Sequence, residues 1–418
     1  MEDEAKTESF RDWDALPDDL LRNIGDLLDL RCCIWFRGVC RSWRAALPGL
    51  PPPWLVIPGG WCRCDDMVDL GFLSPPSPAG AQWLTANNPC IGSSAGWLAF
   101  LHMSLIVFLV NPVTHAQVRL PPLRRRDGFL EPFPPCYCNC VVAERRRRNG
   151  ELPEMEQDNL IRKIAFSANP TAEDHAVAVL CRWGFGLAFI KAGLDRWQWV
   201  HWPDATGRSG IGGDGEATDG CSNTDLDITY HHGKFYYMTQ CGQIWSIDPA
   251  APPPVVPVPV AKCCPPAPES SMMPGKHLAF TQDGTLHVVW GDGPGLIPRD
   301  DTRNRPMRMH VQRYHPDSSW TTAPHLSGQA FLIGNRSQSL GVPASVVSAP
   351  STWIRPNCVY FTCIVPGSDL EETFDDHHAD IWEFDVNTGL FRVVSRKQDF
   401  PDSVEWAKAI WFTPSLVW

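Results

Sequence analysis

Residues 13–47 read WDALPDDLLRNIGDLLDLRCCIWFRGVCRSWRAAL, and this stretch decides the fold of the N-terminal part. Its first half has apolar residues at three- and four-residue steps, which predicts an amphipathic helix. These residues are Leu16, Leu20, Leu21, Ile24, Leu27 and Leu28. We expect Asp14 to cap this helix and Pro17 to begin it, because proline at a first helical position loses no needed N–H. A second apolar run, from Trp35 to Trp43, predicts a second helix that ends before Pro48.

The two apolar runs also differ in charge. Residues 14–29 contain five acidic residues and one arginine, whereas residues 31–44 contain four arginines and no acidic residue. A helical unit of this size is below the roughly 40 residues that a self-sufficient core needs without disulfides, metal or a partner. We therefore expect part of its apolar surface to dock on another protein. The periodicity equally allows a helical cap on the domain that follows.

The combination of Leu16-Pro17, Asp19-Leu20-Leu21, Ile24, Leu27 and Val39–Arg44 resembles an F-box. One departure is Ile34-Trp35-Phe36, which is bulkier than the small or charged residues usual there. The resemblance covers residues 13–47 and implies binding to a Skp-type adaptor, and through it to the cullin and RING protein of a ubiquitin ligase. It implies eight adaptor-binding residues, namely Leu16, Pro17, Leu20, Leu21, Ile24, Leu27, Val39 and Trp43.

Composition gives no sign of a nucleic-acid or membrane partner. The formal net charge of the 418 residues is −11, which gives no global reason to bind nucleic acid. Residues 1–12 are acidic and predict a disordered tail without a secretory signal. The longest apolar stretch, Trp97–Val110, is shorter than the roughly 20 residues that span a membrane, and it predicts two strands and a turn. We expect a cytoplasmic or nuclear protein, or one found in both compartments.

The 16 cysteines predict reduced thiols, because the sequence has no secretion signal. Cys62 and Cys64 lie close together in the sequence, as do Cys136, Cys138 and Cys140, and such spacing is compatible with soft-metal binding. Free thiols are the preferred interpretation, and we expect no metal and no cofactor.

From Pro51 onward the sequence becomes typical of β structure. It has many prolines, glycines and tryptophans spread over short apolar runs bounded by turn residues, which favours an all-β sandwich, barrel or propeller. The predicted strands include Trp97–Leu101, Ala176–Cys181, Lys234–Thr239 and Cys358–Thr362.

A loose repeat favours the propeller among these folds. A strand-turn-strand pattern around Gly233 recurs 51 residues later around Gly284. A period near 40–50 residues with several strands per unit is typical of propeller blades, and we expect six or seven of them. The apolar run Ala409–Trp418 predicts the strand that joins the last blade to the first.

This part of the chain also resembles a known family. Gly334–Leu340, Arg355–Thr362, Asp380–Asp385 and Ile410–Leu416 are similar to segments of plant F-box proteins with a KIB-type β-propeller. The resemblance spans roughly residues 90–418. It implies a plant source and a domain built of blades, but no particular cargo.

Two segments interrupt the β pattern. Residues 123–159 contain Arg124–Arg126 and Arg145–Arg148, which predict a charged, solvated insertion, with a nuclear-import signal or a contact with an acidic partner as alternatives. Residues 250–269 are rich in proline and predict a stiff connector between blades, or a docking site for a proline-reading module.

No motif predicts catalysis. Gly210–Gly215 matches the dinucleotide-binding string but lacks the strand before and the helix after it that phosphate binding needs. The pairs His231-His232 and His377-His378 lie beside turns, and Asp375, Asp376 and Asp380 flank the second pair. A loop metal site is conceivable there, but exposed polar loop residues explain the pattern more simply. We expect no catalytic residues.

The sequence thus predicts an α+β multidomain protein: residues 1–12 as a tail, 13–48 as a helical F-box and 49–418 as an all-β propeller. The predicted function is the substrate-recognition subunit of an SCF-type (Skp–cullin–F-box) E3 ubiquitin ligase, a non-catalytic receptor that binds an unknown protein cargo. Such a receptor acts by proximity, because it brings an acceptor lysine near a ubiquitin-loaded enzyme. The alternatives are an adaptor-binding scaffold that degrades nothing and an enzyme built on the propeller.

Overall fold

The structure is a computed structural model of the chain. The structure describes residues 13–28, 30–47, 54–58, 68–74, 77–86, 90–102, 105–112, 114–123, 161–181, 186–200, 225–239, 242–252, 255–261, 276–292, 308–334, 336, 338–347, 353–362, 381–395 and 410–413. The chain divides into two compact units, Met1–Pro51 and Pro52–Trp418. In the described parts of both units, no helix combines the length and the apolar character needed to cross a membrane.

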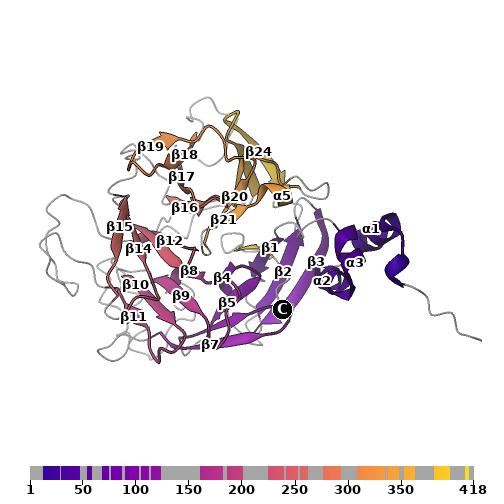
Figure 1. The fold of residues 1–418 in the computed structure, drawn as a ribbon, viewed down its shortest axis with the longest axis horizontal. Helices are drawn as coiled ribbons and strands as arrows, with labels where there is room; N and C mark the ends of the chain where they lie inside the picture. Colours follow the sequence, from indigo (N-terminus) through magenta and orange to yellow (C-terminus); the bar gives the residue numbers. More distant parts are fainter. Residues whose placement is uncertain are drawn as a thin grey trace, which may run out of the picture. The chain divides into compact units, whose positions relative to one another are not determined.

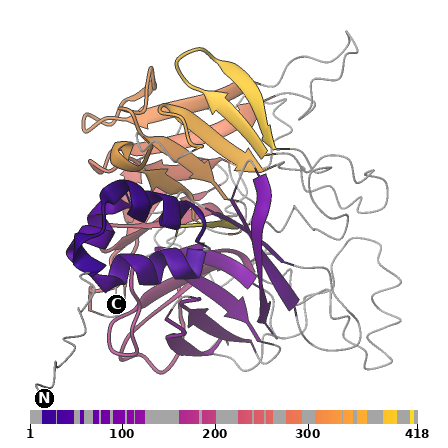
Figure 2. The same ribbon diagram turned by 90° about the vertical axis from the view of Figure 1, so that its right-hand side faces the viewer.

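The N-terminal unit is helical, as its periodicity predicts. A 3-10 turn, η1 (Trp13–Ala15), precedes α1 (Asp18–Asp26), α2 (Leu30–Val39) and α3 (Arg41–Ala46), which are indigo in Figures 1 and 2. The predicted cap is wrong: Pro17 is the N-cap residue of α1 and no side chain caps the helix. Asp14 belongs to η1 instead.

The second apolar run forms two helices, so the prediction of one helix is wrong. The break is at Cys40, whose backbone is extended with φ −157° and ψ 179°. Its Sγ atom accepts a hydrogen bond from the backbone N–H of Trp43 at 3.5 Å. Cys40 therefore starts α3 by capping it, a role that more often falls to Ser or Asp.

A small core holds the three helices together. Its fully buried members are Leu21, Phe36 and Ala46, with other apolar side chains packed against them. Gly25 lets the helices approach closely, because a Cβ atom there would collide with the side chain of Leu47. Three buried side chains among the described residues make a small core, in keeping with the expectation that so short a unit buries little of its apolar surface.

The described residues of the second unit form six sheets. The first sheet contains β1 (Trp54–Pro58), β2 (Val68–Ser74), β3 (Ser77–Ala86) and β25 (Ile410–Phe412). The second contains β4 (Cys90–Ser94), β5 (Trp97–Leu101), β6 (Ile106–Val110) and β7 (Gln117–Pro122). The third contains β8 (Ile161–Phe166), β9 (Ala176–Cys181), β10 (Gly186–Lys191) and β11 (Gln198–Trp199).

The remaining sheets follow in chain order. The fourth contains β12 (Asp225–His231), β13 (Lys234–Thr239), β14 (Ile244–Ile247) and β15 (Val258–Ala261). The fifth contains β16 (His277–Phe280), β17 (Leu286–Asp292), β18 (Arg308–Tyr314) and β19 (Trp320–Thr322). The sixth contains β20 (Ala330–Ile333), β21 (Leu340–Val342), β22 (Cys358–Thr362), β23 (Ile381–Asp385) and β24 (Leu390–Ser395), with the short helix α5 (Ala344–Val347) between β21 and β22.

The sheets lie around a common centre (Figure 1). Strands β25, β4, β8, β12 and β16 are neighbours in that order on the inner side, and β16 lies next to β20 and β21. Five hydrophobic clusters fill the spaces between neighbouring sheets in the described residues. This arrangement, with each sheet packed face to face against the next, is that of a β-propeller.

The C-terminal strand closes the ring, as the apolar run at 409–418 predicts. Strand β25 pairs antiparallel with β1, with Leu55 opposite Trp411. The first sheet therefore combines three strands from the start of the domain with an inner strand from the end of the chain. Such pairing gives β1, the first strand of the domain, a partner on each side, so that it is not a free edge.

The sixth sheet departs from the simple antiparallel pattern. Strand β20 pairs antiparallel with β21 but parallel with β22, and α5 lies in the connection. All four residues of β20 are buried. The sequence prediction missed this strand, because a short apolar run carries no periodicity that separates a buried strand from a helix.

The proline-rich segment is also different from its prediction. Residues Val258–Ala261 form β15, which pairs with β14 at the outer edge of the fourth sheet. Proline has no N–H to donate, so it is tolerated in edge strands, where one row of N–H groups faces away from the sheet. The interpretation of residues 250–269 as a connector is therefore wrong for 258–261.

Candidate functional site

Exposed large apolar side chains gather in the helical unit. Among the described residues, six of the nine such side chains lie between Trp13 and Val39. They are Trp13 (56% exposed), Leu20 (48%), Ile24 (40%), Leu27 (87%), Trp35 (47%) and Val39 (58%). The propeller, although far larger, contributes only Val256, Val258 and Leu390 to the same set. Single exposed apolar residues are ordinary, but a concentration of them marks an interaction surface.

Helix α1 has two apolar faces, which explains this exposure. Leu21, Gly25 and Leu28 follow one another at four- and three-residue steps on the face that packs toward the core. Leu20, Ile24 and Leu27 follow the same steps one residue earlier, on a face that stays exposed. Two adjacent leucines, Leu20 and Leu21, therefore have opposite environments.

Helix α2 also has exposed apolar side chains, Trp35 and Val39, which are four residues apart and so share one face. Phe36 points the other way, into the core. Sequence reasoning did not include Trp13 or Trp35 among the adaptor-binding candidates. The spacing of Trp35 and Val39 was a signal that could have identified Trp35.

The eight predicted adaptor-binding residues thus fall into three groups. Pro17, Leu20, Ile24, Leu27 and Val39 are exposed. Leu16 and Trp43 are partly buried against the core, and the indole N–H of Trp43 donates to the backbone oxygen of Trp13 at 2.9 Å. Leu21 is fully buried and forms part of the core.

Charged side chains accompany the apolar surface. Asp18 and Asp19 are exposed in the first turn of α1, where a negative charge also favours the helix N-terminus. Arg41 and Arg44 are exposed on α3. Exposed apolar side chains together with charges of both signs match the composition of protein–protein interfaces, which combine an apolar centre with a polar rim.

Within the propeller, a buried polar cluster lies on three inner strands. Lys163 of β8 forms an ion pair with Asp227 of β12, and His277 of β16 has its Nδ1 atom 4.0 Å from the Asp227 carboxylate. Burial lowers the pKa of Lys163 and raises that of Asp227, because both lose hydration of the charged form. Burial also lowers the pKa of His277. The cluster links three neighbouring sheets, and sequence reasoning did not find it.

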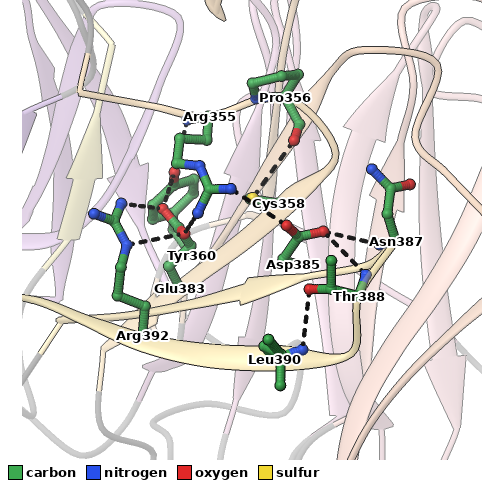
Figure 3. A network of polar contacts seen from close by, with 10 residues as sticks. All are labelled: Arg355, Pro356, Cys358, Tyr360, Glu383, Asp385, Asn387, Thr388, Leu390 and Arg392. Carbon is green, nitrogen blue, oxygen red and sulfur yellow. Dashed lines mark hydrogen bonds and ion pairs between the residues drawn. The ribbon is translucent and has the colours of Figure 1, made fainter.

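A second polar network lies in the sixth sheet (Figure 3). The buried carboxylate of Glu383 accepts hydrogen bonds from Arg355 at 2.7 Å, from Arg392 at 2.6 Å and from the hydroxyl of Tyr360 at 2.6 Å. Burial opposes ionisation of Glu383, but these hydrogen bonds and the two positive charges outweigh it and hold the pKa below its usual value. The network joins β22, β23 and β24.

Several motifs from the sequence lie outside the described residues. They are the arginine runs at 124–126 and 145–148, the cysteines at 62–64 and 136–140, the glycine string at 210–215 and the histidines at 377–378. His231 is described, and its ring stacks on Phe280 with centroids 4.1 Å apart. Burial, together with the neighbouring His232, lowers the pKa of His231 to about 4. No group of three or more potential metal ligands occurs in the described part of the chain.

Comparisons with known proteins identify both units. The family model for the KIB1-4 beta-propeller matches residues 72–391, and the model for the F-box domain matches residues 13–53. A search of curated proteins finds no match.

A search of solved structures finds distant similarities. A protein of unknown function from Bacteroides thetaiotaomicron is 11% identical, covering 85% of this chain and 68% of that one, with a TM-score of 0.32. The β-propeller domain of Cps50 (Swd1) from Myceliophteria thermophila is also 11% identical, covering 81% and 82% of the two chains, with a TM-score of 0.30. An oligogalacturonate lyase is 9% identical, covering 82% and 78%, with a TM-score of 0.34. At these values the likeness says nothing about function.

Proposed function

Because the chain belongs to the KIB1-4 beta-propeller family and carries an F-box at residues 13–53, we propose that it is the substrate-recognition subunit of an SCF-type ubiquitin ligase. In this function the helical unit binds a Skp-type adaptor, and the adaptor connects it to a cullin and a RING protein. The propeller binds a cargo protein. The chain itself performs no bond chemistry.

The observation that carries the proposal is the exposed apolar surface of α1 and α2. Leu20, Ile24, Leu27, Trp35 and Val39 remain exposed, whereas three side chains of the unit are buried in its core among the residues whose burial is described. Covering such side chains with a partner removes apolar area from water, worth about 25 cal/mol per Å² before the costs of association. An F-box implies a partner with a groove that accepts the apolar faces of its helices.

The exposure of the predicted residues supports a narrower proposal for that contact. We assign direct contact to the exposed members of the predicted set, which are Pro17, Leu20, Ile24, Leu27 and Val39, and we add Trp35. Leu21 supports the surface from behind, because it fixes α1 against Phe36 and Ala46. Leu16 and Trp43 border the same core and contact the adaptor with their exposed parts.

The proposal is tested by assembling the complex. The full chain is co-expressed with a Skp-type adaptor and a cullin, and the complex is isolated by size exclusion. The variant Leu20→Ala/Ile24→Ala/Leu27→Ala should lose the adaptor, because truncating central interface residues commonly costs more than about 1 kcal/mol each. Leu390→Ala is the matched control, since Leu390 is an exposed leucine (68%) in the propeller.

The results separate the proposal from its alternatives. If the triple variant retains the adaptor at the yield of the control, the docking surface is not this one. If the wild-type chain binds adaptor and cullin, but no bound protein accumulates when cullin activation is blocked, the chain is a scaffold rather than a receptor. Turnover of a small substrate by the isolated complex would instead favour an enzyme.

A further inference from the structure

The centre of the propeller contains a segment of the chain itself. Four described residues between β20 and β21, namely Gly334, Arg336, Gln338 and Ser339, form what we call the central segment, and all four are buried. Three of them have polar side chains, which are rarely buried without partners. The side chain of Gln338 and the backbone of Arg336 bond to strands of other sheets, whereas the Ser339 hydroxyl has no hydrogen-bond partner among the described residues.

Gln338 makes the most extensive of these contacts. Its side-chain oxygen accepts from the backbone N–H of Tyr230 at 3.0 Å, and its side-chain N–H donates to the Ser94 hydroxyl at 2.8 Å. That hydroxyl in turn donates to the backbone oxygen of Phe166 at 3.0 Å. One amide therefore connects the sixth sheet with the fourth, the second and, through Ser94, the third.

Backbone groups near Gln338 also form hydrogen bonds with other sheets. The carbonyl of Arg336 accepts from the N–H of Ile164 at 3.1 Å, and the carbonyl of Ile333 accepts from the indole N–H of Trp411 at 3.0 Å. On the far side, β21 packs so closely on β16 that a Cβ atom at Gly341 would collide with the carbonyl of Phe280. The segment and its flanking strands thus contact all five other sheets.

We propose that the central segment is an internal plug, which seals the centre of the propeller and holds the six sheets in register from inside. The plug uses the backbone groups and hydroxyls of the inner strands that a ligand in the centre would otherwise bind. A partner of the propeller is then left with its rims and outer strands. This proposal does not depend on the proposed ligase function, because every contact in it lies within the second unit.

The reactivity of the Cys90 thiol reports on whether the central segment stays in place. It lies on β4, is buried, and has its pKa raised to about 12 by burial, with Arg336 of the central segment close enough to act on it electrostatically. Cys181 is equally buried, with its pKa also raised to about 12, but it lies in the cluster between the second and third sheets. Unseating the plug should expose the first thiol and leave the second protected.

The experiment measures alkylation of the native full chain by iodoacetamide, mapped by mass spectrometry. Gln338→Ala leaves the Tyr230 N–H and the Ser94 hydroxyl without their buried partner, so local opening becomes easier. We expect Cys90 to be modified at least about tenfold faster, which corresponds to about 1.4 kcal/mol. Gln312→Ala is the matched control, because the Gln312 side chain bonds Thr322 at the surface and should leave the rate unchanged.

The other outcomes of the alkylation experiment also support or overturn the proposed plug. Ser94→Ala, a milder change at the other end of the same hydrogen bond, should raise Cys90 modification in the same direction but less. If Gln338→Ala and Ser94→Ala both leave Cys90 as protected as in the wild type, the segment does not seal the centre. If Cys90 and Cys181 become reactive together in Ser94→Ala, the effect is general unfolding, and the local plug is wrong.

Discussion

In the helical unit, apolar side chains as large as Leu27 and Trp35 remain on the surface, whereas in the propeller charged side chains such as Lys163 and Asp227 lie in the interior. The first arrangement leaves apolar surface uncovered, and the second satisfies polar groups within the chain. An exposed apolar surface is one that a partner would cover, while polar groups paired within the chain need no partner. The difference explains why the two units should respond differently to the same substitution.

The largest expected difference in the free energy of unfolding is between alanine substitutions of two tryptophans. Trp411→Ala removes a buried side chain that packs between β1 and the sixth sheet, and it should destabilise the propeller by about 3–5 kcal/mol. Trp13→Ala changes an exposed side chain (56%) of the helical unit and should leave propeller unfolding unchanged. Denaturant unfolding of the full chain measures both. Equal effects of the two substitutions would contradict the comparison.

A smaller effect is expected at the network of Glu383 in Figure 3. Glu383→Gln removes the charge that Arg355 and Arg392 share, and it should cost about 1.5–3 kcal/mol at neutral pH. Glu173→Gln, at an exposed glutamate, is the control.

The pH dependence of the same network has a definite sign. The folded pKa of Glu383 lies below the ordinary value of 4.5, so its contribution to stability is present above that value and is lost as the pH falls through the folded pKa. Glu383→Gln should therefore lose less stability than the wild type below about pH 4.5. Parallel curves for the two proteins would show that the carboxylate is not what these arginines stabilise.

A still smaller effect is expected in the arginine run at 145–148, which lies outside the described residues. If the run is solvated, changing its four arginines to glutamine should alter the free energy of unfolding by less than about 0.5 kcal/mol. Imaging and co-purification of the same variant test the alternatives, a nuclear-import signal or an acidic partner. A loss of stability well above that limit would place the run inside the folded unit.

How much the sequence predicts depends on the distance over which a feature is encoded. Local patterns predicted many strands correctly: Trp97–Leu101, Ala176–Cys181, Lys234–Thr239 and Cys358–Thr362 have the predicted bounds. The apolar end of the chain predicted the closing strand, because an unpaired edge strand is a hazard that proteins avoid.

Features that depend on distant parts of the chain were not predicted. Gln338 bonds to Tyr230 and to Ser94, which are 108 and 244 residues away, so no local pattern shows that it is buried. The apolar period of α1 likewise gave a broad stripe, but it could not tell which of Leu20 and Leu21 faces the core, because that depends on where α2 and α3 pack.

Those two leucines give the most direct test of the central claim, that the exposed face of α1 binds the adaptor. Leu20→Ala and Leu21→Ala are compared as full chains, with affinity for a Skp-type adaptor measured by calorimetry and helical unfolding followed by circular dichroism. The account predicts that Leu20→Ala weakens adaptor binding more than about fivefold without changing stability, whereas Leu21→Ala destabilises the helices by about 2–5 kcal/mol. Unchanged affinity for Leu20→Ala, or destabilisation by it as large as that of Leu21→Ala, would contradict the claim.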